Sequence, residues 1–320
     1  MNFCTHFDSN YLPHAISLAK SLNIHLKNFR LFMMCMDDES FSYLSSNPIK
    51  NTVPIHFSKM EGFFPELIVA KQNRNRIEYF FTCSPAVCNY VIKNNSNIES
   101  ITYLDSDLYF FSSPKIIFNE IENKSIAIIE HRFNWIIKRQ IKYGKYNVGW
   151  ITFKNDMQGL NCVNDWMSDC LNWCYQKVEK NRFGDQKYLN NWPNKYDNLY
   201  VIKHKGANVA IWNIGNYKLL KFKNQVYIDN EKLIFYHFAN FNQISHRCFK
   251  TNLSRVFVRL NGILKNDIYL HYANEIINNN VLNKTIVTKT DNHLNSGLKK
   301  MVTLIYRGLR NILYRDEFCV

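Results

Sequence analysis

Short apolar runs alternate with segments of helical periodicity along most of the chain. Residues 2–7 and 29–36 have the composition of buried strands, and residues 10–22 between them carry apolar side chains at helical spacing. A third short strand is expected at 53–57, followed by a long and mostly buried helical segment at 77–93. Strands that alternate with helices at this spacing predict an α/β fold with crossover helices and a mainly parallel sheet.

The same alternation continues through the middle of the chain and changes after about residue 246, where the apolar clusters become shorter. We therefore expect one domain at 1–245 and a helical C-terminal extension at 246–320. Within the first domain, the apolar runs predict further strands at 101–104, 125–130, 146–153, 201–203 and 233–237, and an amphipathic helix at 161–177.

The last part of the extension, residues 298–315, combines an apolar stripe at helical spacing with basic residues outside it. Such a helix can lie at the interface of an anionic membrane. It can equally dock on the protein's own core or on a second subunit, and the sequence leaves both open. The stripe consists of Leu298, Met301, Val302, Ile305, Leu309, Ile312 and Leu313.

Composition narrows the class of protein without choosing a function. A chain of 320 residues that is 46% hydrophobic can bury a substantial core, which argues against disorder. The formal net charge of +14 favours anionic partners such as nucleotide phosphates, nucleic acid or anionic lipids. Nucleic-acid binding is the weaker alternative, because the Lys and Arg residues are spread along the chain and no standard nucleic-acid motif occurs.

The cysteines and the N-terminus predict a cytoplasmic location. The nine cysteines are an odd number without a CxxC pair and lie mostly among apolar neighbours, so we expect reduced, packed thiols rather than zinc sites or disulfides. The N-terminus lacks the features of a signal peptide, and no apolar run reaches the ~18 residues that a membrane span needs. We expect a soluble protein or one peripheral at the inner face of the cytoplasmic membrane.

Two carboxylates, Asp105 and Asp107, directly follow the apolar strand predicted at 101–104. Buried carboxylates are costly unless they are paired, hydrogen-bonded or bound to a metal. The pair is either a solvated turn or the beginning of a site for a hard divalent cation. The second interpretation agrees with the position, since ligands of open α/β sheets bind beyond the carboxyl ends of the strands.

Four segments downstream of these carboxylates carry further motifs in a definite order. They read GKYNVGWITFKND, RFGDQKYLNNWP, HKGANVAIWN and FYHFANF, at 144–156, 182–193, 204–213 and 235–241. A strand that ends D-x-D, then N-x-G, G-D-Q, A-N and H-F motifs, resembles the nucleotide-sugar glycosyltransferases of the GT-A fold. The similarity is to the family 8-like group, which includes glycogenin and bacterial lipopolysaccharide sugar transferases. It covers about residues 1–245 and implies a Rossmann-like, mixed, mainly parallel sheet flanked by helices.

The resemblance assigns residues to a nucleotide-sugar site. In the family the first strand and the following helix hold the base and ribose, and an arginine before the D-x-D motif reaches the nucleotide. That arginine is Arg76 here, with Arg74 as an alternative. Lys203 could add positive charge against the leaving diphosphate. The expected donor-binding residues are Thr5, His6, Phe7, Asp8, Tyr11, Arg76, Asp105, Ser106, Asn147, Gly149, Lys205 and Asn208.

The resemblance also implies a Mn²⁺ or Mg²⁺ ion that bridges the two donor phosphates. Asp105 and Asp107 would bind it together with a histidine. We favour His237, which lies in an H-F pair, although Asn240 stands where the family has a glycine; His204 remains the alternative. The catalytic positions would be Asp185 and Gln186, which match the D-Q pair beside the anomeric carbon.

The function implied by the resemblance is metal-dependent transfer of a hexose from a nucleotide-diphosphate sugar, expected to be a UDP-sugar, to a hydroxyl of a glycan or glycolipid. The expected reaction retains the anomeric configuration and serves cell-surface polysaccharide or lipopolysaccharide synthesis. A nucleotidyltransferase is a further alternative. Such an enzyme typically carries a glycine-rich, basic loop after its first strand, whereas residues 5–10 contain no glycine, lysine or arginine.

Overall fold

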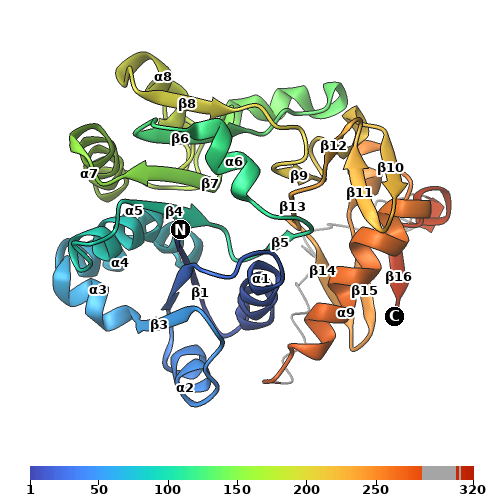
Figure 1. Cartoon of the computed structure of the whole chain (residues 1–320), viewed down its shortest axis with the longest axis horizontal. Helices are drawn as coiled ribbons and strands as arrows, with labels where there is room; N and C mark the ends of the chain where they lie inside the picture. Colours follow the sequence, from blue (N-terminus) through green and yellow to red (C-terminus); the bar gives the residue numbers. More distant parts are fainter. Residues whose placement is uncertain (283–307, 310) are drawn as a thin grey trace, which may run out of the picture.

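The computed structural model describes residues 1–282, 308–309 and 311–320. Its centre is a seven-stranded sheet in the order β3-β2-β1-β4-β7-β6-β8 (Figure 1). Strand β7 runs antiparallel to both of its neighbours, and all other neighbouring strands are parallel. The strands are β1 (Asn2–Phe7), β2 (Arg30–Cys35), β3 (Thr52–His56), β4 (Ser100–Leu104), β6 (Ile126–Glu130), β7 (Tyr146–Lys154) and β8 (Leu199–Ile202).

Helices cover both faces of this sheet. Alternate residues of β1 point to opposite faces, so Phe3 joins one apolar core and Cys4 the other. The core around Phe3 contains α1 (Leu12–His25), α2 (Asp38–Ser46) and α6 (Lys115–Ile121). The core around Cys4 contains α3 (Phe57–Phe63), α4 (Glu66–Gln72), α5 (Arg76–Lys93) and α7 (Met157–Asn172). The predicted fold class, a mixed and mainly parallel sheet between helices, is confirmed.

A third apolar core lies beside the large sheet and contains three small sheets. One joins β5 (Leu108–Phe110), β13 (Phe235–His237) and β9 (Val209–Ala210). The others join β10 (Leu219–Phe222), β11 (Gln225–Ile228) and β12 (Glu231–Lys232), and β14 (Asn242–Ser245), β15 (Cys248–Lys250) and β16 (Glu317–Cys319). The remaining short helices are η1 (Trp135–Tyr143), η2 (Lys187–Asn191), α8 (Trp192–Lys195), η3 (Ile214–Asn216), η4 (Leu253–Val256), η5 (Leu264–Tyr269) and α9 (Leu270–Asn278).

The C-terminal part differs from the helical extension that the sequence predicts. Strands β14 and β15 pair across the expected boundary at residues 245 and 246, and the third core contains residues from both sides of it. Its described residues include the strands β15 and β16 as well as helices, which corrects the prediction of a helical extension. The physical reason is that β16 pairs with β15 from 71 residues further along the chain, which local periodicity does not reveal.

The cysteines also depart from expectation at one place. Cys248 and Cys319 form a disulfide between β15 and β16, which corrects the prediction that all thiols are reduced. The other seven cysteines are free and buried, as predicted.

Most of the predicted amphipathic stripe at 298–315 lies outside the described residues. Three of its apolar members that are described, Leu309, Ile312 and Leu313, are exposed. Binding of this stripe to a membrane stays a prediction. In the part of the chain that the structure describes, no helix combines the length and hydrophobicity that a membrane crossing needs.

Candidate active site

A cavity of about 510 Å³ opens where the carboxyl ends of β1 and β4 meet the beginning of β7. This is the edge at which open α/β sheets bind ligands. The antiparallel pairing of β7 with β4 places Asn147 and Val148 next to the residues that follow Leu104. The cavity is lined by His6, Phe7, Asp8, Asn10, Tyr11, Arg76, Ile77, Phe80, Phe81, Ser84, Tyr103, Asp105, Ser106, Asp107, Asn147, Val148, Asp185, Gln186 and His237.

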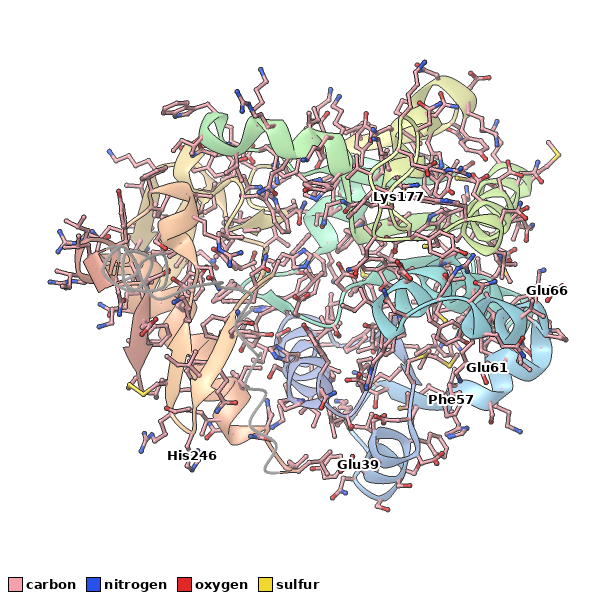
Figure 2. All side chains as sticks on the ribbon, turned by 180° about the vertical axis from the view of Figure 1, so that it is seen from behind. Glu39, Phe57, Glu61, Glu66, Lys177 and His246 are labelled. Carbon is pink, nitrogen blue, oxygen red and sulfur yellow. A yellow bond between two sulfur atoms is a disulfide. The ribbon has the colours of Figure 1, made fainter. Side chains whose placement is uncertain are left out.

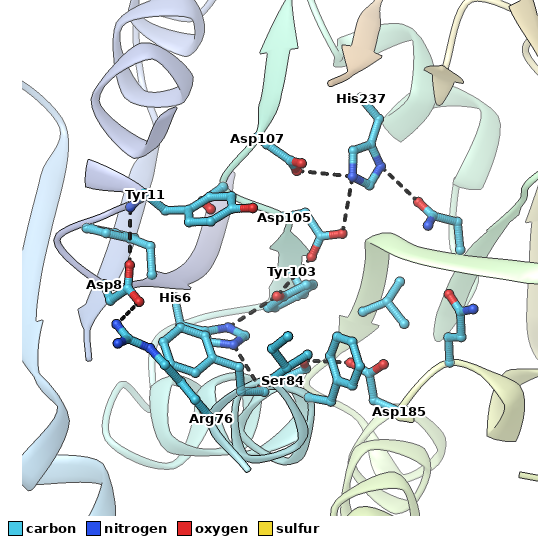
Figure 3. A pocket seen from close by; sticks show the side chains of 18 of the residues that line it. His6, Asp8, Tyr11, Arg76, Ser84, Tyr103, Asp105, Asp107, Asp185 and His237 are labelled. Carbon is cyan, nitrogen blue, oxygen red and sulfur yellow. Dashed lines mark hydrogen bonds and ion pairs between the residues drawn. The ribbon is translucent and has the colours of Figure 1, made fainter. Parts of the chain in front are cut away.

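Asp105 and Asp107 point toward His237 at one side of the cavity (Figure 3). The two carboxylates lie in the short connection between β4 and β5, and His237 reaches them because β13 pairs with β5. Its Nε2 lies 3.0 Å from Asp107 Oδ1 and 3.6 Å from Asp105 Oδ2. One ligand atom from each of the three residues lies within 4.8 Å of the others. This spacing lets one cation contact all three.

A chain of hydrogen bonds behind His237 sets which ring nitrogen carries its proton. His237 Nδ1 lies 3.2 Å from Asn147 Oδ1, an atom that can only accept. The same oxygen accepts from the backbone N–H of Gly149, and the amide nitrogen of Asn147 lies 3.2 Å from His131 Nε2. His131 Nδ1 in turn lies 3.1 Å from the carbonyl oxygen of Lys145. His237 therefore donates to Asn147, Asn147 to His131, and His131 to the Lys145 carbonyl oxygen. Because Nδ1 carries the proton of neutral His237, its Nε2 lone pair faces the carboxylates.

The charges in this cluster are strongly interdependent. Burial raises the pKa of Asp105 to about 6, with Asp107 adding to the rise and His237 opposing it. Burial also acts to raise the pKa of Asp107, but the charge of His237 and its hydrogen bond outweigh burial and lower it. For His237, burial acts to lower the pKa, and the two carboxylates raise it above the ordinary value. A proton on His237 and a cation between the three groups are thus alternative ways to balance the same negative charge.

Another part of the cavity combines a further carboxylate, Asp8, with an exposed arginine. Asp8 follows β1, and one of its oxygens accepts from the backbone N–H groups of Asn10 and Tyr11 at 2.9 and 3.2 Å. Its other oxygen is ion-paired with Arg76, whose side chain is 62% exposed. Arg76 is the first residue of α5, where Asn75 and Glu78 form a capping box. The helix start thus holds a solvent-accessible guanidinium at the mouth of the cavity.

Asp185 comes from a distant segment, packs beside α5 and is buried. It accepts a hydrogen bond from the Ser84 hydroxyl at 2.8 Å. Burial raises its pKa to about 7, and the negative charge of Asp105 adds to the rise against the opposing Ser84 bond. The neighbouring Gln186 donates from Nε2 to the carbonyl oxygen of Tyr143 at 3.1 Å, which ties it to the end of η1. Near neutral pH Asp185 can therefore act either as a hydrogen-bond donor or as an acceptor.

Most of the residues predicted for the site reach this cavity, and some do not. Thr5 is fully buried one residue before His6 and does not line it. Lys205 is ion-paired with Asp229 at 2.7 Å, away from the cavity. Asn208 is also fully buried, and its amide donates to the carbonyl oxygen of Glu130. The predictions for these three side chains as ligand contacts are corrected, because Thr5 is buried in the sheet and Lys205 and the Asn208 amide are bound to other protein groups.

The structure also separates the alternatives that the sequence left open. His204 lies next to Glu231 and accepts from the N–H of Gly206, so it does not belong to the carboxylate cluster. Arg74 donates to Thr82 and to the carbonyl oxygen of Leu171, which leaves Arg76 as the arginine at the cavity. Lys203 is exposed and is not among the lining residues.

Gly149 acts on the site without lining the cavity. A Cβ atom at this position would lie 2.6 Å from Asn147 Oδ1 and 2.8 Å from His237 Nδ1. The glycine is therefore needed for the close approach of these two side chains.

Sequence reasoning missed several members of the site. Tyr103 donates to Asp105 at 3.0 Å and touches His6, and it could have been found because it precedes Asp105 by two positions in the strand. Ser84 lies in the middle of α5 and carried no local signal, since its role depends on Asp185 from a distant segment. His131 likewise carried no local signal, because only the pairing of β6 with β7 brings it to Asn147.

Comparison with known proteins places the chain in a family. No family model matches it. The uncharacterized protein YfnD of Bacillus subtilis (strain 168) is 32% identical over 254 residues, which cover 78% of this chain and 80% of YfnD. The uncharacterized protein YfnF of the same organism is 30% identical over 253 residues, 76% of this chain and 82% of YfnF. The chain belongs to the family of these two proteins.

Several solved structures align with part of this structure. The galactosyltransferase LgtC in complex with donor and acceptor sugar analogues aligns with a TM-score of 0.46 at 14% identity, over 68% of this chain and 78% of LgtC. The apo form of mouse xyloside xylosyltransferase 1 aligns with 0.47 at 14% identity, over 75% and 98%. The apo glycosyltransferase GlyE of Streptococcus pneumoniae TIGR4 aligns with 0.49 at 14% identity, over 87% and 62%. The overlap with each of them is partial.

Proposed function

We propose that the protein is a metal-dependent glycosyltransferase of the GT-A type, which transfers a hexose from a UDP-sugar to a hydroxyl of a glycan or glycolipid. The observation that carries the proposal is the convergence of Asp105, Asp107 and His237 from separate elements at the carboxyl edge of the sheet. It is supported by the cavity beside them and by the order of sequence motifs. An isolated solvated turn would not account for a buried imidazole held in one tautomer between two carboxylates.

The three side chains fit a Mn²⁺ or Mg²⁺ ion. Carboxylate oxygens suit both cations, and the imidazole nitrogen favours Mn²⁺, since Mg²⁺ is held mainly by oxygens. The hydrogen bond from His237 Nδ1 to Asn147 is the outer-shell contact that fixes a ligating imidazole. When bound, such a cation neutralises the negative charge that develops on a departing nucleoside diphosphate.

The remaining cavity residues bind and orient the donor. Tyr11 is 45% exposed at the rim and offers a ring face for the base, while Asp8 can accept from a ribose hydroxyl. The guanidinium of Arg76 can leave Asp8 for a phosphate, because its side chain is largely exposed. Asp185 and Gln186, which line the cavity, would hold the hydroxyls of the sugar. We assign no covalent nucleophile, and retention of configuration is the outcome that the motif resemblance favours.

The acceptor and the cellular role follow from the same resemblance. We propose that the acceptor hydroxyl belongs to a cell-surface polysaccharide or lipopolysaccharide precursor and that the protein works at the inner face of the cytoplasmic membrane. The exposed end of the apolar stripe, at Leu309, Ile312 and Leu313, is consistent with a membrane-bound acceptor.

The test is hydrolysis of donors by the purified full-length protein without acceptor. A panel of UDP-, GDP- and CMP-sugars is incubated with Mn²⁺ or with EDTA, and release of nucleotide is measured. We expect slow, Mn²⁺-dependent release of UDP from one sugar. The substitutions Asp107→Asn and His237→Asn should lower it by at least roughly 10- to 100-fold, the loss that follows when only the hydrogen-bond partners of metal ligands are removed.

The matched control is His204→Asn, because this histidine was the alternative ligand in the sequence and it lies beside Glu231, outside the carboxylate cluster. This variant should keep the wild-type rate. The proposal is wrong if no nucleotide sugar is cleaved and no nucleotide binds in a metal-dependent way. It is also wrong if His237→Asn and His204→Asn behave alike.

A further inference from the structure

Helix η1 and its flanks form a surface with exposed apolar and basic side chains. Trp135 is 81% exposed, the highest value among the large apolar side chains in the described part of the chain, and Ile141 is 47% exposed. The segment 131–146 contains no Asp or Glu. We use the term η1 patch for Trp135, Ile141, Lys138, Arg139 and Lys142, all of which are exposed.

The exposure of these residues is not explained by packing of the helix. Phe133 and Ile137 already pack against the third core, and Asn134 fixes the start of the helix by donating its backbone N–H to the carbonyl oxygen of Trp212 at 2.7 Å. Figure 2 shows this helix in light green at the edge of the molecule, with side chains that extend away from the body. The inner side of η1 is therefore packed, and within residues 1–282, 308–309 and 311–320 the side chains of Trp135 and Ile141 stay largely exposed.

The η1 patch is directly connected to the candidate active site. The carbonyl oxygen of Tyr143, the last residue of η1, accepts from Gln186, which lines the cavity. The next turn of chain supplies the Lys145 carbonyl that holds His131, and through it Asn147 and His237. Whatever binds the patch is thereby brought next to the cavity.

We propose that the η1 patch docks on an anionic membrane surface, with Trp135 and Ile141 in the headgroup region and Lys138, Arg139 and Lys142 against acidic lipid headgroups. Tryptophan is favoured at membrane interfaces, because its large ring is apolar and its N–H is polar. Basic side chains beside it add attraction to anionic lipids, and an acidic side chain would oppose it. Charge complementarity thus favours an anionic bilayer over an apolar or cationic protein surface.

Docking in this way orients the protein on the membrane. Because Gln186 joins the end of η1 to the cavity, docking of the patch brings the cavity close to the surface on which a lipid-linked acceptor would lie. This consequence for the acceptor rests on the proposed function, whereas membrane binding itself does not.

The test is co-sedimentation of the full-length protein with vesicles of phosphatidylcholine alone or mixed with phosphatidylglycerol. We expect binding to the anionic vesicles that weakens as salt is added. Two double substitutions, Trp135→Ser with Ile141→Ser and Lys138→Glu with Arg139→Glu, should each weaken it by at least about tenfold. Hydrolysis of the donor without vesicles should stay unchanged for the first of them, so loss of membrane binding is distinguishable from failure of the proposed activity.

Three control variants separate the η1 patch from general effects. Met157→Ser removes an apolar side chain that is 76% exposed on α7, and Lys27→Glu with Lys59→Glu changes charge elsewhere. Both should bind like the wild type. The third replaces Leu309, Ile312 and Leu313 by Ser and tests the terminal stripe. The inference fails if the η1 variants bind like the wild type, if only the terminal variant loses binding, or if neutral and anionic vesicles bind equally.

Discussion

His237 illustrates how a single side chain depends on neighbours that are distant in the sequence. Its Nε2 can serve as a ligand only if Nδ1 carries the proton. The Oδ1 atom of Asn147 imposes this state, and the backbone of Gly149 together with His131 fixes the orientation of that amide. Strand β7, rather than the histidine's own strand β13, thus determines which ring nitrogen of His237 carries the proton.

Asp185 should make the stability of the protein depend on pH in a specific direction. Its pKa is about 7 in the folded protein against 3.8 ordinarily. Between these values the folded state holds a proton that the unfolded state has lost, so stability falls as the pH rises through this window. Asp185→Asn cannot ionise, and its melting temperature relative to the wild type should increase from pH 4 to pH 8. The corresponding gain in the free energy of unfolding, relative to the wild type, is at most about 4 kcal/mol.

Thermal unfolding in EDTA across this pH range is the measurement. Asp165→Asn is the control with the opposite sign. Burial acts to raise the pKa of Asp165, but Lys195 and Tyr196 outweigh burial and lower it. Asp165→Asn should therefore lower the free energy of unfolding at neutral pH, and this loss should become smaller as the pH falls. A difference between Asp185→Asn and the wild type that does not change with pH would contradict the assignment of the raised pKa.

At the scale of elements, strand β7 does most to assemble the site. It pairs with β4 and β6, and it supplies both Asn147 and the close approach at Gly149. Because β7 is antiparallel to β4, its first residues lie at the edge where β4 ends. A parallel strand in this place would put the same residues at the opposite end of the sheet.

Gly149→Ala should damage the metal site without touching a ligand. The added Cβ would lie 2.6 Å from Asn147 Oδ1 and 2.8 Å from His237 Nδ1, so one of these side chains must move. We expect Mn²⁺ to bind about 10- to 100-fold more weakly in the presence of UDP, as for other losses of outer-shell contacts. Calorimetric titration measures this.

Gly62→Ala is the matched control for Gly149→Ala. Gly62 lies in α3, and a Cβ there would meet nothing within 4 Å. Alanine in a helix is more favourable than glycine by roughly 0.5–1 kcal/mol, so this variant should be slightly more stable. Its affinity for Mn²⁺ should not change. If Gly149→Ala also binds Mn²⁺ like the wild type, the hydrogen bond from His237 to Asn147 is not important for the site.

At the scale of the whole molecule, the described C-terminal residues pack against the rest of the protein. His14 on α1 lies 2.7 Å from the hydroxyl of Tyr272 on α9, and Lys20 donates to Asn279. Strand β16 then pairs with β15 and is joined to it by the bridge between Cys248 and Cys319. The last residues of the chain thus stabilise the core from which His237 reaches the cavity.

Loss of the bridge should lower the stability of the entire protein. The two cysteines are 71 residues apart, and closing a loop of this length restricts the unfolded chain. Cys319→Ser should reduce the free energy of unfolding by roughly 2–4 kcal/mol. Dithiothreitol should cause a similar loss in the wild type and no further loss in the variant. An unchanged melting temperature of the wild type under reducing conditions would show that the bridge does not form in solution.

The sequence by itself determined the class of fold and the position of the two carboxylates. Both depend on local properties, since the spacing of apolar residues follows the period of the helix or strand. The end of a buried strand is visible where charged residues interrupt the apolar run, as at Asp105. The helical pattern likewise identified α5 closely, at 77–93 against Arg76–Lys93.

Tertiary structure alone decided which side chains meet. The sequence only favoured His237 over His204 and Arg76 over Arg74, and it is strand pairing and the start of a helix that bring His237 and Arg76 to the cavity. The same holds for the roles of Ser84 and His131 and for the disulfide at β16. These contacts join residues far apart in the chain, and their geometry is set by packing of whole elements. No local pattern of residues carries that information.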